Sequence, residues 1–208
     1  MKFYSRPEKG PALGRTAGLF GGAVLQKFGD LAVEDEGRLK NLSIREHFLT
    51  RIFALARLRK LQQSGSMHSL ERFHSLNHLL LMALSPTKLS ELDRLVANAD
   101  GERTAIALNL YARYFREALG KPVRRASPID VLIYTVGCFK RKPSTSEKLH
   151  FVEKLESYRR ARTPLCSAAS IRRSWVIRFK STFLREQTFF NPFPDELTTL
   201  DDSGASRT

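Results

Sequence analysis

The sequence predicts an all-α protein: a compact multi-helix domain of about six helices, preceded by a short partial N-terminal segment. Apolar residues recur at spacings of three and four through most of the chain, whereas the alternation typical of strands hardly occurs. Helix-start and helix-stop signals fall at the ends of these periodic stretches. A hydrophobic content of 42% and a charged content of 27% are ordinary for a globular domain with a sizeable core.

Each predicted helix is bounded by a recognisable signal. Residues 43–46 read as a capping box at the start of the first helix, and Gly65 ends it. Ser85 and Pro86 end the second helix and open the third, because Pro restricts the residue before it and suits a first helical turn. In chain order, the helices are expected near 43–63, 69–84, 87–99, 106–119, 129–139, 144–162 and 163–180.

The later helices carry expectations about burial. The helix at 129–139 is apolar nearly all round and is predicted to be the most buried of the set. Tyr158 and Trp175 fall at core spacing, so packing is favoured over base stacking. In the last helix, Arg172 and Arg173 are predicted to face outward.

No run of about eighteen apolar residues occurs, and the first residues lack the apolar stretch of a secretory signal. The expectation is therefore a cytoplasmic protein without a membrane partner. Cys138 and Cys166 are too few for a disulfide framework or an iron–sulfur cluster and read as buried thiols. No cofactor is expected in this chain.

Positive charge is concentrated in residues 121–185, which hold sixteen Lys or Arg and four Asp or Glu within a chain of net charge +14. A localised basic field attracts polyanions and favours a nucleic-acid partner. A solvated surface, an acidic protein partner and anionic lipid remain alternatives. The predicted RNA-binding face consists of Lys140, Arg141, Lys142, Arg159, Arg160, Arg162, Arg172 and Arg173, which would neutralise phosphates with little base readout.

Catalytic and metal-binding signals are weak. His74 and His78 lie four residues apart, a spacing that suits zinc, but Ser75 stands where a zinc protease places its glutamate and no third ligand is evident. Residues 34–36 read as a solvated acidic turn. No nucleophile elbow and no Gly-rich loop after a strand occurs. We therefore predict no catalytic residue and no metal ligand.

Several dispersed blocks in residues 67–200 resemble the YbgA-like bacterial family, a helical domain of unassigned chemistry. The resemblance includes Gln187-Thr188 and the family-motif residues Phe73, His74, Ser85, Pro86, Tyr158, Asn191 and Pro192. This chain departs from the opening motif at Leu76, His78 and Leu84, where members commonly carry basic or histidine side chains. A disordered tail is expected at 201–208.

Residues 1–62 resemble the C-terminal end of a thiouracil-desulfidase-like domain followed by a connecting helix. The resemblance rests on blocks such as 18–20, 33–39 and 45–48. In that family, cysteines of the N-terminal part bind an iron–sulfur cluster, and the two domains often occur fused in this order. The cysteine-bearing part is not in this sequence, so the cluster is expected only in a missing N-terminal half.

The two resemblances together imply an accessory role in transfer RNA desulfidation. The chain would hold RNA, with transfer RNA as the expected partner, and would work with a desulfidase-like domain in cis or in trans. Catalysis by this chain alone is not expected. The alternatives are a helical protein–protein interaction module and a truncated fragment of a fused desulfidase with no activity of its own.

Overall fold

A computed structural model confirms the all-α class. Its described residues contain eight α-helices and no strand, so the helices outnumber the six or so expected. No helix among the described residues combines the length and the apolarity needed to cross a membrane. The predicted tail and most of the first thirty residues lie outside the described part of the chain. The described residues are 23, 26–27, 31–99, 104–120, 126–139, 143–160, 162–163 and 165–197.

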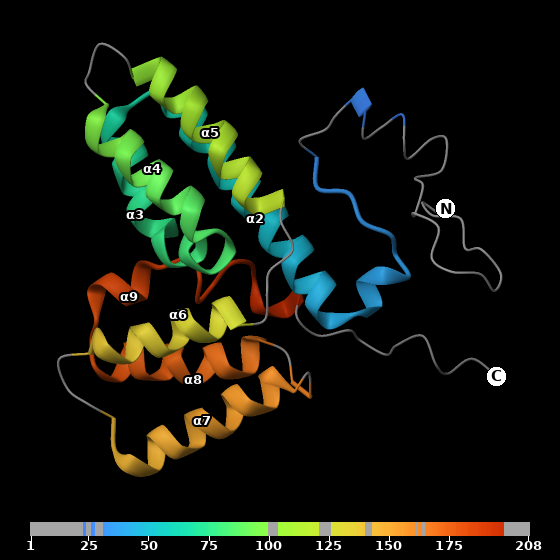
Figure 1. The fold of residues 1–208 in the computed structure, drawn as a ribbon, viewed down its shortest axis with the longest axis vertical. Helices are drawn as coiled ribbons and strands as arrows, with labels where there is room; N and C mark the ends of the chain where they lie inside the picture. Colours follow the sequence, from blue (N-terminus) through green and yellow to red (C-terminus); the bar gives the residue numbers. More distant parts are fainter. Residues whose placement is uncertain are drawn as a thin grey trace.

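The helices form two stacked groups (Figure 1). Helices α2 to α5 lie side by side in the first group, and α6 to α8 lie across one end of it. The segment after α8 returns between the two groups. In chain order the elements are the 3-10 helix η1 (Arg38–Lys40), α2 (Leu42–Ser64), α3 (Met67–Leu84), α4 (Pro86–Asn98), α5 (Thr104–Gly120), α6 (Ala126–Gly137), α7 (Thr145–Arg159), α8 (Leu165–Arg178), α9 (Thr182–Glu186) and the 3-10 helix η3 (Asp195–Leu197).

Three predicted helix boundaries are confirmed. Ser85 caps α4 by accepting a hydrogen bond from the Lys88 backbone at 3.4 Å, and Pro86 is the first helical residue. Ser144 and Glu147 form the reciprocal capping box of α7. Gly65 ends α2 with a φ of 60°, a conformation that glycine adopts without steric cost.

The predicted capping box at the start of α2 is wrong. The helix begins at Leu42, and Asn41 is its N-cap. The Asn41 side-chain oxygen accepts hydrogen bonds from the backbone N–H groups of Ser43 and Ile44 at 3.1 and 3.3 Å. Asn41 therefore satisfies two unpaired donors of a first turn that begins two residues earlier than predicted.

Burial also departs from the sequence prediction at α6. The helix contacts α3 on one side and α7 and α8 on the other, which leaves a third face open. Ile133 and Tyr134 on that face are each 52% exposed, whereas Ile129 and Leu132 are buried. The expectation that this helix is the most buried was therefore wrong. The apolar side chains on the third face of α6 form an exposed patch and are not part of the core.

Candidate functional site

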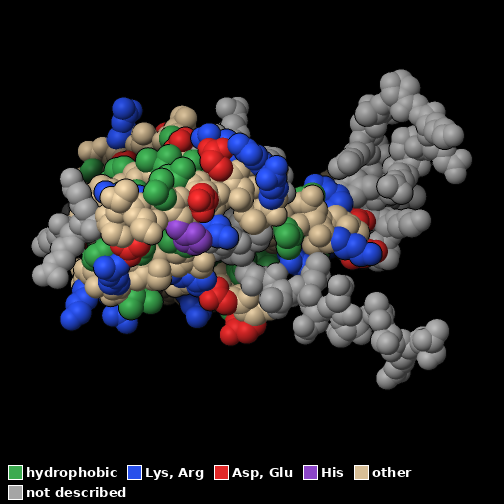
Figure 2. All heavy atoms as spheres, turned by 90° about the horizontal axis from the view of Figure 1, so that it is seen from below, with side chains coloured by type: hydrophobic (Ala, Val, Ile, Leu, Met, Phe, Trp, Pro, Cys, Tyr) green, Lys and Arg blue, Asp and Glu red, His purple; other side chains and the backbone are tan. Residues whose placement is uncertain are grey.

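The predicted RNA-binding residues at the end of α7 are exposed. Arg159, Arg160 and Arg162 all reach solvent, and the Arg159 guanidinium lies 2.9 Å from the Glu156 carboxylate. An exposed pair of this kind contributes little, so it leaves Arg159 able to exchange its partner for a phosphate. On the face seen from below, Lys and Arg are interspersed with acidic and apolar side chains (Figure 2). The cluster at 140–142 lies outside the described residues.

The predicted outward orientation of Arg172 is wrong. Its side chain is 0% exposed. The guanidinium carbon lies 4.1 Å from the ring centre of Phe151 and 4.6 Å from that of Trp175, and one terminal nitrogen donates to the Leu132 carbonyl at 2.7 Å. Burial lowers the pKa of Arg172 to about 9, although Cys138 opposes the shift. Arg172 stabilises the packing of α6, α7 and α8 and does not face a ligand.

Arg172 is buried because α8 lies between α6 and α7. Ala168, Arg172 and Trp175 have the i, i+4, i+7 spacing of one helical face, and all three are buried. The predicted inward orientation of Trp175 is confirmed. Arg172 lies on the same helical face as Trp175 and is therefore buried with it.

Arg173, the next predicted RNA contact, is half-buried and holds the C-terminal segment. Its guanidinium lies 2.7 Å from the Asp195 carboxylate and 2.7 Å from the side-chain oxygen of Asn191. From the other helix group, Arg57 donates to the Pro192 carbonyl at 2.6 Å. The family-motif residues Asn191 and Pro192 thus have a structural role, because two arginines anchor them between the groups.

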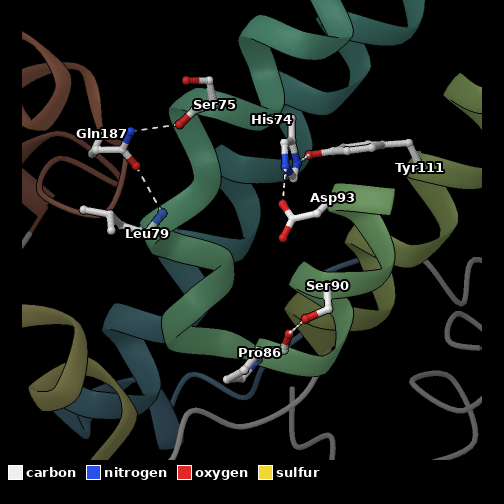
Figure 3. A network of polar contacts seen from close by, with 8 residues as sticks. All are labelled: His74, Ser75, Leu79, Pro86, Ser90, Asp93, Tyr111 and Gln187. Carbon is white, nitrogen blue, oxygen red and sulfur yellow. Dashed lines mark hydrogen bonds and ion pairs between the residues drawn. The ribbon is translucent and has the colours of Figure 1, made fainter. Parts of the chain in front are cut away.

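The motif residues Phe73 and His74 of α3 contact other helices of the first group. Figure 3 shows His74 between Asp93 and Tyr111. Phe73 packs edge to face against Tyr111 of α5. One ring nitrogen of His74 lies 3.1 Å from the Tyr111 hydroxyl, and the other lies 2.8 Å from the Asp93 carboxylate of α4. Burial lowers the pKa of His74 even though Asp93 opposes the shift. This chain of hydrogen bonds fixes α3, α4 and α5 against one another.

Gln187 ties the C-terminal segment to the middle of α3 (Figure 3). Its side-chain nitrogen donates to the Ser75 carbonyl at 2.8 Å, and its oxygen accepts from the Leu79 backbone N–H at 3.1 Å. Ser75 and Leu79 are the two groups that an uninterrupted α-helix pairs with each other. Thr188 continues the contact by donating its backbone N–H to the Leu76 carbonyl at 2.9 Å. The motif Gln187-Thr188 therefore has a docking role.

Three arginines of α2 and α5 line a cleft of about 380 Å³, which we call the arginine cleft. Arg51 comes from α2, and Arg113 and Arg116 come from successive turns of α5. The cleft also contains Glu117, whose carboxylate already lies 2.8 Å from the Lys88 ammonium. The C-terminal end of α5 adds a partial negative charge of about half an elementary charge. The three guanidinium charges outweigh the Glu117 carboxylate and the helix end together, so the net charge of the cleft is positive. Its remaining lining residues are Leu55, Leu119 and Gly120.

A second cavity, of about 340 Å³, adjoins the arginine cleft where the two helix groups meet, and we call it the junction cavity. The two spaces share Arg51 and Gly120. The buried part of the lining is mainly apolar or aromatic, and the half-buried or exposed part is mainly polar. The lining residues are Glu34, Arg38, Ser43, Ile44, Glu46, His47, Thr50, Arg51, Leu80, Ala83, Leu84, Gly120, Pro128, Tyr158, Phe189 and Pro192.

Two side chains that line the junction cavity each have a buried nitrogen without a hydrogen-bond partner among the described residues. The two nitrogens are Nδ1 of His47 and Nε of Arg51. Burial, reinforced by the charge of Arg51, lowers the pKa of His47 to about 4, so its imidazole is neutral near pH 7. Burial also lowers the pKa of Arg51, while Glu34 opposes that shift. Buried polar groups are normally paired, so a ligand with complementary atoms would be stabilised here.

Residues 78–194 match the family described as "Protein of unknown function (DUF1722)". Because this match covers more than half of the chain, the protein belongs to that family. It is also similar to the "Uncharacterized protein YbgA" of Escherichia coli (strain K12), with 25% identity over 148 residues, which cover 70% of this chain and 88% of that protein. No solved structure matches the chain. The YbgA-like resemblance is thus confirmed, and the desulfidase-like resemblance of residues 1–62 stays a prediction.

Neither the arginine cleft nor the junction cavity was predicted from the amino-acid sequence. Arg51, Arg113 and Arg116 lie before the strongly basic segment, so a search for dense runs of charge passes over them. One local signal was present: His47 and Arg51 are four residues apart, and Arg113 and Arg116 are three apart, so each pair shares a helical face. The packing of α2 against α5 brings the pairs together, and no local pattern specifies that packing.

Proposed function

We propose that this chain is a non-catalytic RNA-binding protein that holds transfer RNA by its phosphates. The observation that carries the proposal is the convergence of Arg51, Arg113 and Arg116 on one cleft. Guanidinium groups suit phosphate because their planar donors can make paired hydrogen bonds to it. The net charge of +14 would add long-range attraction for a polyanion.

The exposed arginines at the end of α7 extend the same surface. Tyr158 lines the junction cavity, and Arg159, Arg160 and Arg162 follow it directly in the chain. The arginine cleft, the junction cavity and the end of α7 are therefore neighbours in that order. A backbone of phosphates laid along them would meet basic side chains at both ends of its path.

The resemblance of residues 1–62 supports an accessory role in removing sulfur from thiouridine in transfer RNA. In this proposal the iron–sulfur cluster and the catalytic residues belong to a desulfidase-like domain, supplied in cis or in trans, and this chain holds no cofactor. Its contribution is to hold and orient the RNA. The proposed place of action is the cytoplasm, where transfer RNA is found.

A salt titration of transfer RNA binding tests the proposal. If about five phosphates are engaged, affinity should fall by roughly 10² to 10³ between about 50 and 200 mM salt, because each engaged phosphate releases condensed counterions. Charge reversal at Arg159 and Arg160 should weaken binding of all RNA sequences alike. Absence of RNA binding at 50 mM salt would refute the proposal.

The second candidate is a helical protein–protein interaction module. Apolar side chains on α6, α7 and α8 are exposed to solvent in the described part of the chain, which is the specific observation in its favour. Capture of a partner that persists after nuclease treatment would support this function, whereas loss of the captured material with nuclease supports RNA binding. The exposed residues are Ile133, Tyr134, Leu149, Val152 and Ile177.

A further inference from the structure

The junction cavity and the arginine cleft are joined, and their linings differ in chemistry. They share Arg51 and Gly120, so one ligand can extend from one space into the other. The cleft presents guanidiniums, and the cavity presents buried apolar and aromatic side chains. A ligand that satisfies both spaces has an anionic group beside a compact ring.

The cavity has the size and the lining of a small-ligand site. Its volume of about 340 Å³ falls within the range of roughly 300 to 1,000 Å³ that is typical of such sites. Leu84, Tyr158 and Phe189 are all buried and line it. Apolar and aromatic surfaces of this kind favour a flat ring, because stacking and apolar contact do not depend on which base is present.

Two polar side chains of the cavity lining, His47 and Arg51, suit a nucleotide. His47 lines the cavity and is neutral near pH 7, so its imidazole offers one donor and one acceptor. Nε of Arg51 is buried and has no hydrogen-bond partner among the described residues. A purely apolar ligand would leave both groups unsatisfied, and a free phosphate would leave the apolar lining empty.

We propose that the junction cavity binds one nucleotide of the RNA, with the base against its apolar lining and the phosphate at Arg51, Arg113 and Arg116. This inference rests on the proposed RNA-binding function and makes it more specific. The base would leave the stack of the RNA to enter the cavity, so unpaired nucleotides would bind there more readily than paired ones. His47, as a donor and an acceptor in the lining, would contribute to a preference among bases.

Calorimetric titrations with uridine monophosphate, uridine and inorganic phosphate test the proposal. The monophosphate should bind at least tenfold more tightly than either of the other two probes, because only it fills both spaces. In Arg51→Met its affinity should fall at least tenfold. Affinity of the monophosphate no greater than that of inorganic phosphate would refute the cavity as a nucleotide site.

A second variant tests the ring-binding part separately. Ser43 is exposed and lines the cavity, so Ser43→Trp places a ring there without disturbing the core. It should weaken the monophosphate at least tenfold and leave inorganic phosphate within twofold, whereas Ser90→Trp, on an exposed serine of α4, should change neither. Unchanged monophosphate affinity in Ser43→Trp would overturn the proposal.

Titration of transfer RNA with the same proteins separates this inference from the function on which it rests. If transfer RNA binds and the monophosphate does not, the nucleotide cavity is wrong and RNA binding stands. If transfer RNA fails to bind at 50 mM salt, the proposed function is wrong, and binding of the monophosphate would then indicate a site for free nucleotides. That result would overturn the proposal as stated for RNA.

Discussion

His74 in one helix group and Arg172 in the other are two buried polar side chains that the fold accommodates in different ways. In the α2–α5 group, His74 has partners on both ring nitrogens, Tyr111 and Asp93. In the α6–α8 group, Arg172 is fully buried among aromatic rings, and two of its three side-chain nitrogens have no hydrogen-bond partner among the described residues. The first arrangement is a satisfied network, and the second depends on cation–π contact.

A second contrast between the groups is that a dense run of basic residues in the sequence does not mark where arginines gather at a cleft. The α6–α8 group contains most of the strongly basic segment, yet one of its arginines is in the core and another, Arg173, is paired with Asp195. The α2–α5 group has less net charge and still brings Arg51, Arg113 and Arg116 into one cleft. Arrangement in space decides which arginines can meet a ligand.

Substitution of Arg172 should change stability more than any other substitution considered below. Arg172→Ala should lower the free energy of unfolding by about 3–5 kcal/mol, because it leaves a cavity among Phe139, Phe151 and Trp175. Arg172→Met should be near neutral or stabilising, since a hydrophobic side chain of similar volume needs no hydrogen-bond partners. Urea denaturation of both variants checks this difference.

The Arg172→Met variant also tests whether Arg172 contacts RNA, as the sequence predicts, or is part of the core. Arg172→Met should bind transfer RNA within about twofold of the wild type, because the residue has no access to solvent. A tenfold loss of RNA affinity in a stably folded Arg172→Met protein would show that Arg172 contacts RNA after all.

The next effect is the dependence of stability on pH. Burial lowers the pKa of His47 to about 4, and it also lowers that of His74. The unfolded chain then binds more protons than the folded chain below pH 6.5, so stability is full above that pH and falls as the pH drops toward 4. We expect His47 to contribute about 2 kcal/mol of this loss after solvent screening.

Urea denaturation at pH 7.5 and pH 5 measures this effect, with His47→Gln as the comparison. The variant removes one titrating group and should lose less stability between the two pH values than the wild type. Equal losses in the two proteins would mean that His47 titrates normally in the folded state.

The smallest effects concern the helix caps. Ser144→Ala and Asn41→Ala should each cost about 1 kcal/mol, because each removes the side chain that accepts hydrogen bonds from the first turn of α7 or α2. Ser43→Ala, at the cap predicted from sequence, should cost a few tenths of a kcal/mol at most. Thermal denaturation distinguishes these cases, and a cost at Ser43 equal to that at Asn41 would restore the predicted capping box.

Local features of the fold could be predicted from the sequence, whereas features that depend on packing could not. Ser85, Ser144 and Gly65 were identified because capping and left-handed turns involve only neighbouring residues. The burial of Arg172 depends on α8 lying between two helices. The spacing of Arg172 from Ala168 and Trp175 places all three on one helical face. Because arginine is rarely buried, the sequence nevertheless predicts that Arg172 faces solvent.

The candidate site was even less predictable. The arginine cleft needs α2 beside α5, and the junction cavity needs both groups and the returning C-terminal segment. Gln187 and Asn191 hold that segment through contacts with residues far away in the sequence. Nothing in the periodicity of single helices indicates such contacts, so the shared helical face of His47 and Arg51 does not by itself identify a cavity.

Contact between the arginine cleft and RNA phosphates should appear in the salt dependence of transfer RNA binding. Arg51→Met combined with Arg113→Met should reduce the slope of log affinity against log salt by about two, one for each lost phosphate contact. Arg72→Met combined with Arg94→Met removes two exposed arginines outside the cleft and should leave the slope unchanged. Equal slopes for the two double variants would show that the arginine cleft does not contact RNA phosphates.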